Sequence, residues 1–133
     1  MKTFLFISSD PGVTRALIPV VRQLYLEKNF IIIGGGEDAE SIWQIETGFN
    51  IKYNKFDDDI SEKKVKIFLN GIRPDLVIVG AGLYNMIEHT FRRASIKMKI
   101  FCFSMLDFWA GYSSRFQRMV DGKCISSMPD KIG

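Results

Sequence analysis

The residues best suited to chemistry stand together in one short segment, Asp107–Arg115. This segment holds an acid, Asp107, two large aromatic residues, Trp109 and Tyr112, and a basic residue, Arg115. A connection that only turns the chain is more often built from Gly, Pro, Asn and Ser. Trp and Tyr each offer apolar area with one polar tip, and arginine offers a planar cationic fork. We therefore predict that the segment contributes to a ligand crevice. A structural interpretation also stands, in which the aromatic residues cap the core.

Two connections that contain glycine could contribute to the same crevice. Ser9, Asp10 and Gly12 lie at the start of a predicted helix, where free backbone amides and the helix dipole favour an anion. The carboxylate of Asp10 works against a phosphate there, so a simple helix cap is the alternative. Gly80 and Gly82 follow a strongly apolar strand and could let a ligand approach the backbone, or could only permit tight packing.

Other chemical groups give weaker signals. Glu88 and His89 are neighbours on a predicted helix and point to different faces. We expect His89 to be solvated, and the alternative is a role as a base if it turns toward the cleft. The acids Asp57–Asp59 precede a helix and are expected to serve its dipole. The single histidine and the two cysteines, Cys102 and Cys124, have no metal-ligand spacing, so we expect no metal ion and no cofactor.

An alternation of strands and helices must position these residues. Apolar strands are predicted at Thr3–Ser8, Phe30–Ile33, Asp75–Val79 and Lys99–Ser104, and a short, weaker strand at Phe49–Tyr53, at an edge of the sheet. Amphipathic helices are predicted from Pro11 with Asp10 as the N-cap, over Asp38–Thr47, from Ser61, and over Tyr84–Ile96. This pattern indicates an α/β Rossmann-like three-layer sandwich, with a five-stranded parallel sheet and helices on both faces. Right-handed crossovers favour the strand order 3-2-1-4-5.

That strand order brings the candidate residues to one edge. The first and fourth strands become neighbours, so Ser8–Gly12 and Gly80–Gly82 flank the topological switch point. The segment from Asp107 follows the fifth strand, which lies beside the fourth. We therefore expect the three regions to meet.

The whole chain excludes several classes of function. Its 133 residues predict one domain, 1–133. The net charge is +3 and the basic residues are scattered, so nucleic-acid binding has little support. No stretch approaches the roughly 18 apolar residues of a membrane span, and no signal peptide is evident. We expect a soluble, cytoplasmic protein.

Several segments together resemble a known group of proteins. They are Ser8–Gly12 with Ala16–Val20, Pro74–Gly80, Ile87–Glu88, Leu106–Trp109 with Tyr112, Arg115–Phe116, and Pro129–Ile132. These segments are similar to the amino-terminal domain of bacterial two-domain, GT-B-like glycosyltransferases and UDP-N-acetylglucosamine 2-epimerases. The resemblance implies an acceptor-side domain in surface polysaccharide metabolism that is not catalytic alone. It further implies that Gly133 ends the first half of a longer protein.

The resemblance also implies roles for residues and partners. Asp107 would be the catalytic base or accept a sugar hydroxyl, Trp109 or Tyr112 would stack on a sugar, and Arg115 would pair with a phosphate or carboxylate. The implied partners are a nucleotide sugar or sugar acceptor, and a second Rossmann-like domain or partner chain. Self-association through Phe108, Phe116 or Met119 is also expected. The first loop lacks the Gly-x-Gly-His form of related transferases. The alternative is a flavodoxin-like nucleotide- or metabolite-binding regulatory module or subunit.

Overall fold

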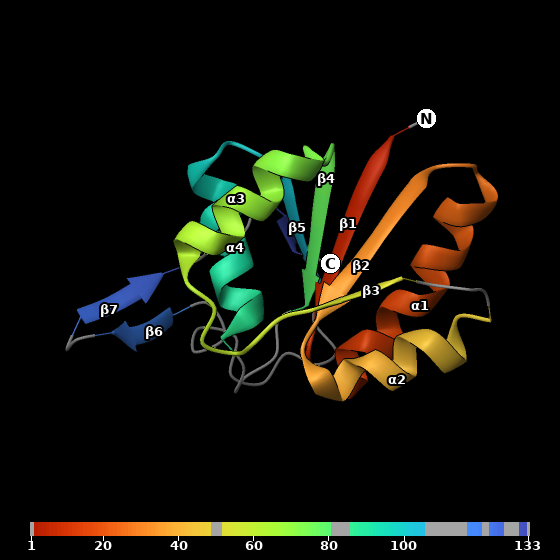
Figure 1. Cartoon of the computed structure of the whole chain (residues 1–133), viewed down its shortest axis with the longest axis horizontal. Helices are drawn as coiled ribbons and strands as arrows, with labels where there is room; N and C mark the ends of the chain where they lie inside the picture. Colours follow the sequence, from red (N-terminus) through yellow and green to blue (C-terminus); the bar gives the residue numbers. More distant parts are fainter. Residues whose placement is uncertain are drawn as a thin grey trace.

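A parallel sheet with helices on both faces forms the centre of the protein in the computed structural model (Figure 1). The structure describes residues 2–48, 52–80, 86–105, 117–120, 123–126 and 131–132. The strands of the sheet are β1 (Thr3–Ser8), β2 (Phe30–Gly35), β3 (Tyr53–Lys55), β4 (Leu76–Gly80), β5 (Cys102–Met105) and β8 (Lys131–Ile132). Their order is β3-β2-β1-β4-β5-β8, with every neighbouring pair parallel. The predicted order 3-2-1-4-5 is confirmed.

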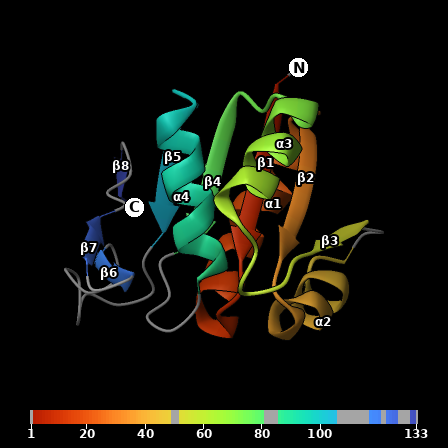
Figure 2. The same cartoon turned by 60° about the vertical axis from the view of Figure 1, so that its left-hand side comes forward.

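The helices lie in two pairs on opposite faces of the sheet (Figures 1 and 2). The pairs are α1 (Pro11–Leu26) with α2 (Glu37–Glu46), and α3 (Glu62–Ile72) with α4 (Ile87–Lys97). Successive side chains of a strand point to opposite faces. Leu5 and Ile7 accordingly pack with the α3 and α4 side, whereas Phe6 packs with the α1 and α2 side. A second, antiparallel sheet joins β6 (Gln117–Val120) to β7 (Lys123–Ser126).

The helix starts follow the local sequence signals. Asp10 is the N-cap of α1 and Pro11 its first residue, as predicted, and the helix continues through Pro19. Ser61 caps α3 by accepting a hydrogen bond from the Lys64 amide at 3.2 Å. These caps fix where two helices leave the sheet edge.

Three strands begin later than the sequence predicts, and β4 does so by a single residue, at Leu76 and not at Asp75. β3 starts at Tyr53, whereas the prediction ended there, and residues 49–51 lie outside the described residues. β5 starts at Cys102 and not at Lys99, because Lys99 has a left-handed backbone with φ of 58°. A left-handed residue cannot lie in a strand, and without a glycine the sequence gives no sign of it.

Candidate functional site

A cleft of about 460 Å³ lies at the carboxyl ends of β1, β2 and β3. Parallel strands bring their carboxyl ends to one edge, where open α/β sheets bind ligands. The cleft is lined by Ser9, Asp10, Pro11, Gly36, Glu37, Asp38, Lys55, Phe56, Asp57, Asp58 and Ile87. Two of the predicted site residues, Ser9 and Asp10, are therefore cleft residues.

The wall between β1 and β2 is closely packed. The Gly36 amide donates a hydrogen bond to Ser9 Oγ at 3.1 Å, and the Tyr53 hydroxyl donates one to the Gly36 carbonyl at 2.5 Å. A Cβ at Gly36 would lie 2.9 Å from Ser9 Oγ, so a larger residue at this position would require the Ser9 side chain to move. Burial first, and then the charges of Glu40 and Glu88, raise the pKa of Tyr53 above its ordinary value. The phenol therefore remains a neutral donor.

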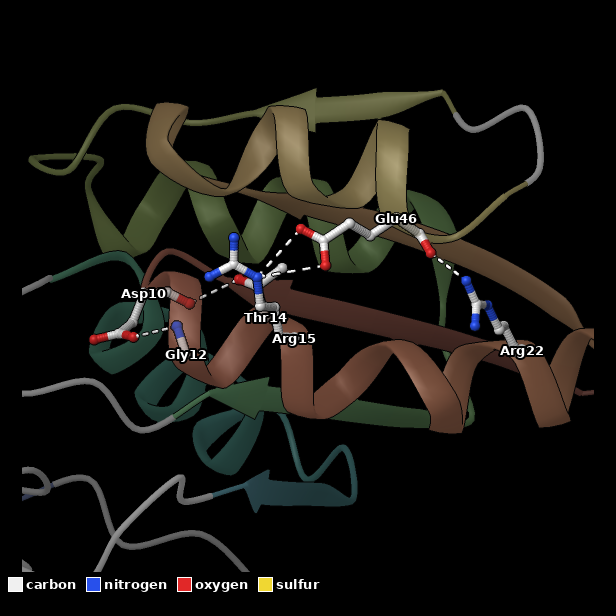
Figure 3. Close-up of polar contacts among 6 residues, drawn as sticks. All are labelled: Asp10, Gly12, Thr14, Arg15, Arg22 and Glu46. Atoms are coloured by element: carbon white, nitrogen blue, oxygen red, sulfur yellow. Dashed lines mark hydrogen bonds and ion pairs between the residues drawn. The ribbon is translucent and has the colours of Figure 1, made fainter.

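The amino end of α1 is occupied by the side chain of its own cap. Asp10 Oδ1 accepts hydrogen bonds from the Gly12 amide at 2.8 Å and the Val13 amide at 3.4 Å. Thr14 Oγ1 donates to the Asp10 carbonyl at 2.8 Å (Figure 3). The amides that could bind a phosphate are thus already bonded to a carboxylate, which also repels an anion. Gly12 is exposed beside the cap.

Buried polar residues beneath this loop hold it in place. Ser8 Oγ lies 2.7 Å from Thr14 Oγ1 and accepts a hydrogen bond from Trp43 Nε1 at 3.0 Å. All three side chains are fully buried. Ser8, Thr14 and Trp43 were not predicted from the sequence as supporting residues. No motif spacing marks them, because they meet only when α1 and α2 pack on the same face of the sheet.

The α1 and α2 helices are also joined at the surface. Arg15 Nε and Glu46 Oε2 form an ion pair at 3.2 Å, and Arg22 donates a hydrogen bond to the Glu46 carbonyl (Figure 3). Arg22 also donates one to the Thr47 carbonyl. The bond from Arg22 Nε to Thr47 measures 3.0 Å. These contacts connect the end of α2 to α1. They help to orient the two helices, both of which begin at the cleft.

The acidic loop that follows β3 forms another wall. Asp58 Oδ1 accepts hydrogen bonds from the Met86 amide at 2.8 Å and the Ile87 amide at 3.4 Å, so it caps α4. The expectation that these acids serve the helix that follows them is therefore wrong for Asp58. Ser61 caps that helix instead. The sequence could not show that Met86, 28 residues along the chain at the start of α4, lies beside Asp58.

The described part of the cleft is strongly acidic. Its ionisable residues are Asp10, Glu37, Asp38, Asp57, Asp58 and Lys55. The Lys55 ammonium lies 3.9 Å from the Glu37 carboxylate, and both side chains are exposed. Such a surface favours hydrogen-bond donors and disfavours phosphate groups. Among the residues described, no group of three or more His, Cys, Asp and Glu could hold a metal ion.

Gly80 lies at the end of β4 but does not line this cleft. Its carbonyl accepts a hydrogen bond from Arg92 Nη1 at 2.7 Å, and a Cβ there would overlap the Glu88 carboxylate. The glycine thus permits close packing of α4 on β4, which is one of the two interpretations the sequence left open. Its role in ligand binding stays a prediction.

Glu88 and His89 are both buried, with exposed fractions of 0% and 2%. The expectation that His89 is solvated is wrong. Helix α4 buries a wide face against the sheet, and Arg92 is fully buried on it as well. Acid, imidazole and guanidinium groups are rarely buried. From residue type alone, Glu88, His89 and Arg92 would therefore be expected at the surface.

The remaining predicted site residues are Gly82, Asp107, Trp109, Tyr112 and Arg115, and all of them lie outside the described residues. Their convergence on the cleft stays a prediction. The same holds for Phe108 and Phe116, while Met119 lies in β6. No helix in the described part of the chain is long and apolar enough to cross a bilayer.

The sequence matches no protein-family model and no curated protein. Solved structures share its fold. A protein of Listeria monocytogenes described as a UDP-N-acetylglucosamine 2-epimerase has a TM-score of 0.59 and 15% identity, over 78% of this chain and 30% of its own. Acinetobacter baumannii MurG has a TM-score of 0.65 and 12% identity, over 80% of this chain and 35% of its own.

The spinosyn rhamnosyltransferase SpnG, complexed with thymidine diphosphate, has a TM-score of 0.64 and 12% identity. It is matched over 99% of this chain and 44% of its own length. The chain therefore spans less than half of each of these solved chains. The expected likeness to GT-B-like glycosyltransferases and 2-epimerases is confirmed at the level of the fold.

Proposed function

We propose that this chain is the acceptor-side domain of a glycosyltransferase-like or sugar-nucleotide-epimerase-like protein. In this role it holds a sugar acceptor beside a nucleotide sugar that a second Rossmann-like domain or partner chain binds. The acidic cleft at the carboxyl edge of the sheet is the observation that carries the proposal. The fold shared with MurG and SpnG supports it.

The charges of the cleft favour an uncharged sugar. Carboxylates accept hydrogen bonds from sugar hydroxyls, and Glu37, Asp38 and Asp57 are exposed at the cleft. The same carboxylates repel a diphosphate, whose binding then depends on cations elsewhere. In this proposal Arg115 is one such cation, Asp107 is the base, and Trp109 or Tyr112 stacks on the sugar. Catalysis then needs the second domain.

A flavodoxin-like nucleotide-binding module is the competing function. It would place a phosphate at the start of α1, where free amides and the helix dipole favour an anion. The Asp10 carboxylate already accepts hydrogen bonds from Gly12 and Val13 there. This contact favours the acceptor-side function. We extend the proposal to surface polysaccharide metabolism in the cytoplasm.

Amide chemical shifts of the labelled chain test the proposed function. We expect neutral methyl glycosides to shift the amides of Gly36, Lys55 and Ile87, and inorganic phosphate to leave Gly12 and Val13 unchanged. Replacing the cleft residue Asp57 by Asn should weaken glycoside binding several-fold, since a neutral amide accepts a weaker hydrogen bond. Asp59→Asn is the matched control, because Asp59 is exposed in the same loop but does not line the cleft.

Two results would contradict the proposed function. One is saturable phosphate binding that shifts Gly12 and Val13, which would favour the nucleotide-binding module. The other is equal loss of glycoside binding in Asp57→Asn and Asp59→Asn.

A further inference from the structure

The end of the sheet opposite the cleft carries basic residues at the entry to four strands. Lys2 precedes β1, Lys28 precedes β2, Arg73 precedes β4 and Lys99 precedes β5. All four residues are exposed. Figure 1 shows the turns that enter β2, β4 and β5 at the same end of the sheet as the amino terminus.

Backbone hydrogen bonds connect these entry segments into one surface. The Phe30 amide donates to the Lys2 carbonyl at 2.8 Å, and the Asp75 amide donates to the Thr3 carbonyl at 2.8 Å. The Phe101 carbonyl accepts a hydrogen bond from β4 at 3.0 Å. The starts of β2, β1, β4 and β5 therefore lie side by side.

Large apolar side chains are exposed on the same surface. Leu26 is 75% exposed, and Phe30, Tyr25 and Phe101 are 53%, 52% and 48% exposed. A hollow of about 290 Å³ lies between Ile96, Lys99, Ile100 and Phe101. We call this surface the amino-edge face. It consists of Lys2, Tyr25, Leu26, Lys28, Phe30, Arg73, Lys99 and Phe101.

Three of the basic residues occupy backbone positions that favour glycine. Lys28, Arg73 and Lys99 have φ angles of 63°, 45° and 58°, each just after a helix or at its C-cap. Glycine or asparagine usually occupies such left-handed positions. A cation complements the negative end of a helix, but a basic residue in the last turn would do so without backbone strain. The basic side chains therefore stand where the backbone prefers glycine.

Two exposed acids, Glu27 and Asp75, lie near the amino-edge face and offset part of this charge. The Asp75 carboxylate accepts a hydrogen bond from the Thr3 amide at 2.7 Å, and Glu27 accepts one from Gln23 at 3.0 Å, but these neutral donors do not cancel the carboxylate charges. The four basic residues of the face outnumber the two acids. The acidic residues Asp10, Glu37, Asp38, Asp57 and Asp58 gather at the opposite, cleft end of the sheet. A basic surface with exposed aromatic and aliphatic tips matches the interface of an anionic bilayer.

We propose that the amino-edge face binds an anionic membrane surface, with the cleft directed away from the bilayer. The basic side chains pair with lipid phosphates, while the exposed apolar side chains enter the boundary between headgroups and acyl chains. A nucleic-acid backbone would also attract the charges but would give Leu26 and Phe30 no apolar environment. This inference goes beyond the proposed function and does not depend on it.

Vesicle co-sedimentation of the full chain tests the inference. We expect the chain to sediment with vesicles of phosphatidylglycerol and phosphatidylcholine in equal parts, and not with phosphatidylcholine alone. The triple variant Lys28→Gly, Arg73→Gly, Lys99→Gly should lower the partition coefficient roughly a hundredfold, since each basic residue near an anionic surface contributes about fivefold. Glycine relieves the left-handed strain at all three positions, so the melting temperature should not fall.

Three comparisons complete the test. Lys63→Gln, Lys64→Gln, Lys66→Gln removes the same charge from α3 and should keep vesicle binding close to that of the wild type. Leu26→Asn should weaken binding several-fold while the dependence on salt stays unchanged, because it removes no charge. The inference is overturned if the glycine variant binds like the wild type, if both triple variants lose binding equally, or if the chain binds labelled duplex DNA but no vesicles.

Discussion

Gly71 and Gly80 differ in how much room each leaves for a side chain. Gly71 lies in α3, and Gly80 ends β4, on which the neighbouring helix α4 packs. A Cβ at Gly71 in α3 meets nothing within 4 Å, whereas a Cβ at Gly80 overlaps the Glu88 carboxylate and crowds Val13. Residue type alone does not separate these cases. The difference arises from how closely α4 approaches β4, and Arg92 holds that approach through its bond to the Gly80 carbonyl.

These two positions give a matched pair of variants. Gly80→Ala should lower the free energy of unfolding by about 1–3 kcal/mol, the usual cost of overpacking a core. Gly71→Ala should raise it by about 0.5–1 kcal/mol, because alanine is a better helix former and the space is open. Urea denaturation followed by circular dichroism measures both. A Gly80→Ala variant as stable as the wild type would show that α4 can move away from β4 at little cost.

At the scale of elements, one acid joins the two helices that cover the α3–α4 face. The Glu62 carboxylate lies 2.8 Å from Lys97 Nζ, 3.5 Å from Arg93 Nε and 3.6 Å from Lys66 Nζ. Partial burial raises the pKa of Glu62, but the hydrogen bond and charge of Lys97, with the charges of Arg93 and Lys66, outweigh it. The pKa of Glu62 therefore lies below its ordinary value.

A pH series should reveal this contribution to stability. Because the pKa of Glu62 is lower in the folded protein, its stabilisation is present above the ordinary value of 4.5 and is lost as the pH falls through the folded pKa. Glu62→Gln should thus melt below the wild type at neutral pH, and the difference should vanish in acid. Glu27→Gln is the control, because Glu27 is an exposed acid at the C-cap of α1. A Glu62→Gln difference that persists unchanged in strong acid would assign the effect to packing.

The elements were predictable wherever one local signal was sufficient. Apolar runs located the strands and right-handed crossovers gave their order. Asp10 with Pro11, and then Ser61, set two helix starts. The features that were missed depend on contacts between distant segments. Asp58 caps α4, which begins far along the chain. Trp43 of α2 donates a hydrogen bond to Ser8 of β1. Of the site, the sequence predicted the sheet edge with Ser9 and Asp10, but not the acidic wall from the β3 loop.

At the scale of the whole molecule, charge separates along the strand direction. Among the residues described, five carboxylates line the cleft where strands of the sheet end. Where the strands begin, Lys2, Lys28, Arg73 and Lys99 outnumber the exposed acids Glu27 and Asp75. Net charge alone, at +3, hides this separation. The two proposals therefore use opposite ends of the sheet, and a variant that affects one should leave the other intact.

Self-association is the prediction that belongs to this scale. If Phe108, Phe116 and Met119 form an apolar surface after β5, the chain should associate as its concentration rises. Light scattering across a dilution series should then show a molar mass that increases with concentration. Replacing Phe116 by Ser should return the mass to that of one chain. A monomer at every concentration would contradict the prediction.

The Asp58 cap also sets a limit on occupancy of the cleft. A ligand hydroxyl that donates to Asp58 Oδ1 competes with the Met86 and Ile87 amides, because both of them donate to that oxygen. The Met86 and Ile87 amides would then lose their acceptor. They lie at the start of α4, where the Ile87 side chain packs into the apolar core beneath β4. Ligand binding and the hydrogen bonding of the start of α4 to Asp58 are thus coupled reciprocally. Each equilibrium is weakened by the other by the same factor. Faster hydrogen exchange at the start of α4 would accompany binding.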